Sequence, residues 1–206
     1  MVDTAPPLPL VFFPGAGGRV AFLRPIAERL ARRRTTMLCE YPGLGGASAD
    51  PSLKTLSDLQ QHLLASLPEQ FDLVTMSMGG VLALRIALEQ PERIRKLVLM
   101  ATSGGVDVAK LGGLDWRDTF RKVQPNVPSW FLEDRTDVTE QLGRITHPTL
   151  LIYGTDDLIA PPSVGELLQQ HLPHAQIEII PDATHDLEIE YPDLIAAFIE
   201  AHLRKP

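Results

Sequence analysis

Short apolar runs alternate with longer amphipathic segments along most of the chain. The apolar runs, which read as strands, are 8–13, 36–40, 71–75, 96–101, 149–153 and 176–180. The amphipathic segments, which read as helices, are 20–33, 52–66, 80–89, 163–171 and 192–203. Strands that are apolar on both faces and separated by helices indicate a parallel sheet covered on both sides. The pattern therefore predicts an α/β fold: a three-layer α/β/α sandwich around a mostly parallel sheet of about six strands.

The segment 103–148 departs from this alternation, because nothing in it reads as a strand. We interpret it as a small helical cap inserted into a single domain that spans 1–206, a length that suits one domain. The cap carries both tryptophans of the chain. Its aromatic residues either line an apolar acyl pocket or hold the cap onto the body; they are Trp116, Phe120, Trp130 and Phe131.

Composition and charge exclude several classes of function. The net charge is −7, and there is no basic stripe, which argues against nucleic acid and anionic membranes as partners. No stretch approaches the roughly 20 apolar residues of a membrane span, and no signal peptide is recognised, so we expect a cytoplasmic protein. The single cysteine, Cys39, reads as a buried, unreactive thiol. No histidine spacing predicts a metal site, and we expect no cofactor.

Candidate chemistry begins at Ser77, which directly follows an apolar strand and precedes Gly79, Gly80 and a helix. A serine on such a turn projects its hydroxyl above the carboxyl edge of the sheet. The following helix N-terminus offers unpaired N–H groups and a positive dipole end, which stabilise a developing oxyanion. The alternative is that Ser77 only caps the helix.

The turn Thr75-Met76-Ser77-Met78-Gly79 resembles the G-x-S-x-G nucleophile elbow of the α/β-hydrolase family. Thr75 stands where the family has its first glycine, so it is open how the tight turn accommodates a β-branched side chain. The resemblance extends over nearly the whole chain, from 8 to 202. The chain starts at the strand that carries the oxyanion loop, so the family's antiparallel N-terminal hairpin is expected to be missing.

The resemblance also implies partners for Ser77, since the family's chain order is nucleophile, acid and histidine. The acid it implies is Asp157, after the strand 149–153, while Asp156 reads as a turn former. The base it implies is His185, after the last strand. It also implies two oxyanion donors, the backbone N–H groups of Met78 and Ala16, with Gly15 or Gly17 as alternatives to Ala16.

These residues predict a serine hydrolase that cleaves a small carboxylic ester or thioester through an acyl-enzyme on Ser77. Three other activities use the same triad: acyl transfer, C–C bond hydrolysis and perhydrolysis. A non-catalytic binding protein with this fold is a further alternative. Arg117 and Arg121 stand one helical turn apart and either receive a carboxylate or an anionic carrier, or are solvated beside neighbouring aspartates. An open sheet edge leaves both a monomer and a homodimer as expectations.

Overall fold

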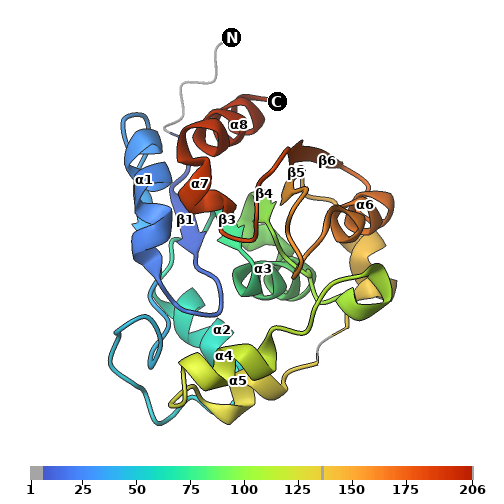
Figure 1. Cartoon of the computed structure of the whole chain (residues 1–206). Helices are drawn as coiled ribbons and strands as arrows, with labels where there is room; N and C mark the ends of the chain where they lie inside the picture. The colour runs from blue at the N-terminus through green and yellow to red at the C-terminus, as the bar shows by residue number, and fades with distance from the viewer. Residues whose placement is uncertain (1–6, 136, 206) are drawn as a thin grey trace.

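One parallel sheet forms the centre of the protein, whose computed structural model describes residues 7–135 and 137–205 (Figure 1). The strands follow the order β2-β1-β3-β4-β5-β6, and every neighbouring pair is parallel. The predicted parallel sheet is confirmed. The strands are β1 (Leu10–Phe13), β2 (Thr36–Leu38), β3 (Phe71–Met76), β4 (Ile94–Met100), β5 (Thr149–Gly154) and β6 (Ala175–Ile180).

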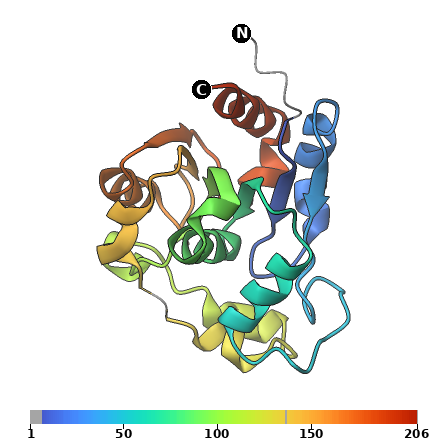
Figure 2. The same cartoon turned by 180° about the vertical axis from the view of Figure 1, so that it is seen from behind.

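Helices cover both faces of this sheet (Figures 1 and 2). The main ones are α1 (Val20–Leu30), α2 (Leu56–Ala65), α3 (Met78–Glu89), α6 (Pro162–His171) and α8 (Pro192–Arg204). Residues of α1 and α8 share one apolar core with Val74 and Val98, and residues of α2, α3 and α6 share the other with Leu73 and Leu97. The strand residues thus alternate between two buried faces, which is why the strands read as continuous apolar runs. None of the helices described is long and apolar enough to cross a membrane.

The element boundaries differ from the predicted ones by a few residues. Helix α2 begins at Leu56 rather than at 52, because the Thr55 hydroxyl accepts a hydrogen bond from the Asp58 N–H and caps the helix there. Strand β4 begins at Ile94, two residues earlier than predicted, after the short 3-10 helix η1 (Pro91–Arg93). The short helix α7 (Leu187–Glu190) was not predicted, since four residues are too few to show a helical period.

The described part of 103–148 contains only short helices. These are η2 (Val108–Leu111), α4 (Arg117–Val123), α5 (Ser129–Glu133) and η3 (Thr139–Arg144). Phe131 and Leu132 of α5 are buried in the same apolar core as α3. An ion pair between Arg85 of α3 and Asp134 makes a second link between this segment and the body.

A buried carboxylate ties together the amino ends of the strands. Asp72 of β3 is fully buried and accepts hydrogen bonds from Arg95 Nε at 2.9 Å and Arg95 Nη2 at 2.6 Å. Arg34, which precedes β2, donates to the same carboxylate at 2.8 Å. Two guanidinium groups therefore share one carboxylate at the end of β3 opposite Ser77.

Asp72→Asn should lower the free energy of unfolding by about 3 kcal/mol, because the amide removes the buried negative charge that Arg34 and Arg95 share. Urea unfolding followed by circular dichroism measures the loss. Asp118→Asn, at an exposed position of α4, is the control and should change stability by less than about 0.5 kcal/mol. Equal unfolding midpoints for the two variants would contradict the role given to Asp72.

Candidate active site

Ser77 occupies a strained turn between β3 and α3. Its φ of 49° and ψ of −114° are values that residues with side chains rarely adopt. Hydrogen bonds hold this backbone on both sides: the Ser77 N–H donates to Met100 O at 2.8 Å, and Ser77 O accepts from Gly80 N and Thr102 Oγ1. The Ser77 side chain makes no capping hydrogen bond to α3. The alternative that Ser77 only caps the helix is therefore wrong.

Thr75 fits beneath this turn because its side chain finds a partner within the sheet. It is fully buried, and its hydroxyl donates to Val98 O of the neighbouring strand at 3.2 Å. The position that requires a glycine is Gly79: a Cβ there would lie 2.7 Å from Phe13 O and 2.8 Å from Pro14 O. The second glycine of the elbow is thus fixed by the close approach of the loop after β1.

The structure brings His185 and Asp157 to Ser77. His185 Nε2 lies 3.1 Å from Ser77 Oγ, and His185 Nδ1 lies 2.8 Å from Asp157 Oδ2. Asp157 is buried, and its other oxygen accepts hydrogen bonds from the N–H groups of Ile159 and Ala160 at 2.8 and 2.9 Å. The carboxylate is therefore held in one orientation, with one oxygen left for the imidazole.

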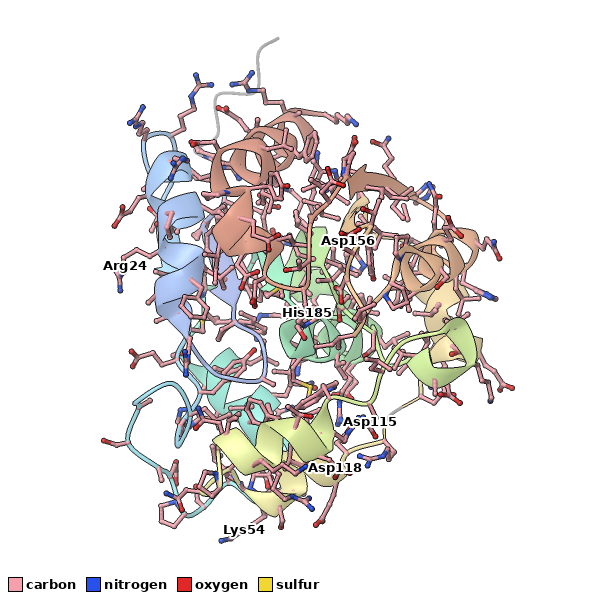
Figure 3. The ribbon with its side chains drawn as sticks, viewed as in Figure 1. Arg24, Lys54, Asp115, Asp118, Asp156 and His185 are labelled. Atoms are coloured by element: carbon pink, nitrogen blue, oxygen red, sulfur yellow. The ribbon has the colours of Figure 1, made fainter. Side chains whose placement is uncertain are left out.

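Asp156 has a different environment. The Asp156 side chain, labelled in Figure 3, is exposed. It accepts a hydrogen bond from Thr155 Oγ1 at 2.9 Å, while the Asp156 backbone N–H donates to Ala183 O. The Thr155 hydroxyl also accepts from the Asp182 N–H in the loop that leads to His185. Asp156 thus belongs to the turn, and Asp157 is the carboxylate beside the imidazole.

The loop after β1 runs directly against Ser77. A Cβ on Gly15 would lie 3.4 Å from Ser77 Cβ, and the Gly18 N–H closes a turn onto Gly15 O at 2.9 Å. The buried Tyr41 hydroxyl donates to Pro14 O and holds the start of the loop in place. Ala16, the second predicted oxyanion donor, lines the same cavity as Ser77 and His185.

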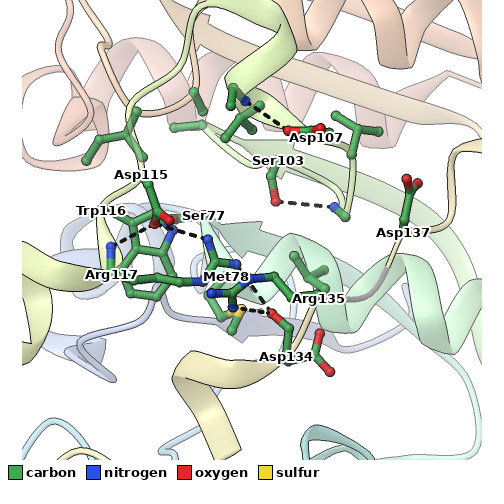
Figure 4. A pocket seen from close by; sticks show the side chains of 18 residues that line it. Ser77, Met78, Ser103, Asp107, Asp115, Trp116, Arg117, Asp134, Arg135 and Asp137 are labelled. Carbon is green, nitrogen blue, oxygen red and sulfur yellow. Dashed lines mark hydrogen bonds and ion pairs between the residues drawn. The ribbon is translucent and has the colours of Figure 1, made fainter. Parts of the chain in front are cut away.

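Two cavities of unlike character meet at Ser77. The polar cavity, about 370 Å³, is lined by Ser103 and six charged residues, together with Met78 and other apolar side chains (Figure 4). The apolar cavity, about 460 Å³, contains His185 and is walled mainly by apolar side chains, among them Phe22, Leu23, Leu114, Phe120 and Val123. Asp115, Trp116 and Ile159 line both cavities and so stand between them.

The predicted pocket residues of the cap are separated by the structure. Trp116 lines both cavities and Phe120 the apolar one, and their rings pack edge to face at 5.3 Å. Trp130 and Phe131 also pack edge to face, at 5.9 Å, but they lie against the core and line neither of these two cavities. Of the four aromatics, two line cavities and two pack against the apolar core.

Glu188 lines the apolar cavity. It was not identified from the sequence as a residue of the site. It is 4% exposed, and within the described part of the chain its Oε2 has no hydrogen-bond partner. Burial raises the pKa of this carboxyl to about 7, with the nearby Asp186 adding to the effect. The sequence carries no signal for it, because Glu188 lies on the unpredicted helix α7, three residues after His185.

The thiol of Cys39 and any grouping of potential metal ligands are the other places where chemistry could reside. Burial raises the pKa of Cys39 to about 12, which keeps the thiol protonated. Residues 7–135 and 137–205 contain no group of three histidine, cysteine or acidic side chains arranged to hold a metal ion.

Comparison with known proteins decides the family. Residues 9–143 and 134–192 match the family described as the alpha/beta hydrolase fold. The chain belongs to this family. Its six-stranded parallel sheet is the sheet of that fold, and the family is one of hydrolases.

Two curated relatives show the chemistry found among similar α/β hydrolases. A pimeloyl-[acyl-carrier protein] methyl ester esterase from Nitrosomonas europaea is 25% identical, over 85% of this chain and 88% of its own. A 2-hydroxy-6-oxononadienedioate/2-hydroxy-6-oxononatrienedioate hydrolase from Cupriavidus pinatubonensis is 26% identical, over 86% and 79%. The solved structure of a hydrolase from Pseudomonas aeruginosa has a TM-score of 0.80 at 22% identity, covering 98% of this chain and 92% of that one.

Gly79→Ala should destabilise the fold by about 1–3 kcal/mol, since the added methyl group meets the backbone carbonyls of Phe13 and Pro14. Urea unfolding measures the effect. Gly143→Ala is the matched control, because a Cβ there meets only His171 O, at 4.0 Å. A Gly79→Ala protein as stable as the control would show that the loop after β1 shifts to accommodate the methyl group at little cost in stability.

Glu188→Gln should change how stability depends on pH. A carboxyl with a pKa of about 7 in the folded state and 4.5 when unfolded destabilises the native protein increasingly as pH rises through that window. Relative to the unsubstituted protein, the variant should gain about 2–3 kcal/mol between pH 5 and pH 8. Thermal unfolding at a series of pH values tests this, and a stability difference that stays constant with pH would contradict it.

Proposed function

We propose that this α/β hydrolase is a serine esterase or thioesterase that works through an acyl-enzyme on Ser77. The observation that carries the proposal is the continuous chain of contacts from Ser77 Oγ to His185 Nε2 at 3.1 Å and from His185 Nδ1 to Asp157 Oδ2 at 2.8 Å. A hydroxyl is a weak nucleophile without an adjacent base, and this arrangement supplies the base and the group that orients it.

In the first step Ser77 Oγ attacks the carbonyl carbon of the substrate while His185 Nε2 takes the hydroxyl proton. Asp157 accepts a hydrogen bond from the His185 Nδ1–H, keeps the imidazole in the tautomer that presents a basic Nε2, and stabilises the imidazolium that forms. The backbone N–H groups of Ile159 and Ala160 on the far oxygen keep the carboxylate from turning away.

The negative charge that develops on the carbonyl oxygen is assigned to two backbone N–H groups, those of Met78 and Ala16. Met78 is the first residue of α3, so its N–H points out of the helix N-terminus, where the dipole is positive. Ala16 lies in the loop that packs against Ser77 through Gly15. Donors fixed in place before the reaction stabilise the oxyanion without a cost of reorganisation.

The position of His185 assigns the two halves of the substrate to the two cavities. The leaving oxygen or sulfur takes its proton from the imidazolium, so it must lie on the side of His185, which lines the apolar cavity. The acyl chain then occupies the polar cavity, which Ser77 also lines. In the second step, water attacks the acyl-enzyme with His185 as base and releases the acid.

C–C bond hydrolysis is a second candidate, because a relative of similar identity is a 2-hydroxy-6-oxononadienedioate/2-hydroxy-6-oxononatrienedioate hydrolase. The methyl ester esterase relative favours the ester. Comparing initial rates on a p-nitrophenyl ester and on a 2-hydroxy-6-oxo-2,4-dienoate separates the two activities.

Ser77→Ala and His185→Ala should each lower kcat on p-nitrophenyl esters by about 10⁴-fold or more. Each substitution removes one residue of the proposed triad, whose residues act only together. Asp157→Asn should lower kcat by at least about 10²-fold, because the amide no longer fixes the tautomer. Asp156→Asn is the matched control and should stay within about two-fold. Steady-state kinetics on folded protein, checked by circular dichroism, gives the values.

A fluorophosphonate probe should label the protein at Ser77, and peptide mass spectrometry locates the adduct. A folded protein that turned over no acyl substrate and took no label would be a binding protein with this fold. Activity lost with Asp156→Asn but kept with Asp157→Asn would overturn the assignment of the acid.

A further inference from the structure

The wall of the polar cavity carries two guanidinium groups, those of Arg117 and Arg135. Both are anchored at the end of α5: Arg117 Nε and Arg135 Nη1 donate to Leu132 O at 3.2 and 2.6 Å, and Arg117 Nη2 and Arg135 Nη1 donate to Asp134 O at 3.4 and 3.0 Å. Because they share neutral acceptors, the two cations lie side by side in the cavity that Ser77 also lines (Figure 4).

The carboxylates of this cavity have partners of their own. Arg135, by contrast, forms no ion pair with any carboxylate in residues 7–135 and 137–205. The hydrogen bonds that Arg135 donates there go to backbone carbonyls, and its charge also helps to lower the pKa of Asp115, the carboxylate that pairs with Arg117. The engaged carboxylates are Asp107 with Lys110, Asp115 with Arg117, Asp134 with Arg85, and Asp137 with the N–H and hydroxyl of Thr139.

Charge and shape select the ligand. A planar guanidinium presents paired N–H donors that match a carboxylate or a phosphate. The aspartates of the same wall repel a ligand more strongly as its negative charge increases, so a singly charged carboxylate suits the cavity better than a phosphate dianion. The lining of the polar cavity also includes the apolar side chains of Met78, Val81 and Val106, which suit methylene groups.

We propose that the polar cavity binds the free carboxylate of a dicarboxylic acid whose other end is the ester or thioester attacked by Ser77. Arg135 is the main counter-ion, and Arg117 lies beside it. The substrate class is thus the half-esters and half-thioesters of aliphatic dicarboxylic acids. This inference rests on the proposed serine mechanism for its orientation, since it places the acyl half of the substrate in this cavity.

The kinetic test compares mono-p-nitrophenyl esters of dicarboxylic acids of about four to eight carbons with neutral p-nitrophenyl esters of the same chain lengths. The unsubstituted protein should show a higher kcat/KM for the half-ester at one or two of these lengths. Arg135→Gln should lower that kcat/KM at least five-fold, mainly through KM, and change the value for the neutral ester by less than two-fold. Arg135→Lys should restore part of the preference.

Arg121→Gln is the matched control. Arg121 is an exposed arginine of the same cap and lines neither the polar nor the apolar cavity, so its loss should leave the half-ester preference unchanged. The proposal is overturned if the unsubstituted protein shows no preference for the half-ester at any length. It is also overturned if Arg135→Gln lowers both substrates equally, or if Arg121→Gln has the same effect as Arg135→Gln.

A binding measurement separates this proposal from the mechanism. Isothermal titration of the Ser77→Ala protein with a monomethyl half-ester reports on the cavity without turnover. Tighter binding of the half-ester than of the neutral methyl ester, lost in Ser77→Ala/Arg135→Gln, supports the carboxylate site even if Ser77 proves not to be a nucleophile. Equal binding of both esters by Ser77→Ala overturns the site while leaving the serine mechanism standing.

Discussion

The backbone of Ser77 is the constraint on which the site depends. A positive φ at a residue with a side chain costs about 1–3 kcal/mol, and it persists only where the surroundings impose it. Here the central strand β3 imposes it, together with the hydrogen bonds to Met100 O and from Thr102 Oγ1. Because the turn is held, the hydroxyl cannot fold back to cap α3, and it faces His185 instead. Removing the hydroxyl should therefore abolish chemistry without releasing the turn.

The other two members of the contact chain reach Ser77 because the sheet is parallel. The loops after β5 and β6 leave the same edge of the sheet as the elbow, and neighbouring strands bring Asp157 and His185 together. The two loops pack so closely that a Cβ on Gly154 would lie 2.2 Å from Ala183 O. A side chain at that position would push apart the segments that hold the acid and the base. The spacing of Asp157 and His185 is thus set by backbone packing as well as by the side chains.

Much of this follows from the sequence, because strand order and loop order are local signals. The apolar runs predicted the parallel sheet, and the resemblance pointed to Ser77, Asp157 and His185, three side chains that are in contact in the structure. The cap resisted prediction, since its helices are short and what they face depends on tertiary packing. Nothing in the sequence predicted that Trp116 lines the cavities while Trp130 packs against the core. Glu188 was missed for a related reason: its burial comes from packing around a four-residue helix.

The cap and the sheet therefore divide the work of the site. The loops at one edge of the sheet hold Ser77, Asp157 and His185, while Trp116 and its neighbours lie between two cavities of unlike polarity that meet at Ser77. Under the proposed mechanism a substrate has one half in each cavity, so the residues that line each cavity contact a different half. The effects of substitutions that are well separated and share no partner usually add. The choice of acid and the choice of leaving group can thus change separately, through substitutions in the short helices of the cap, while the turn at Ser77 stays the same.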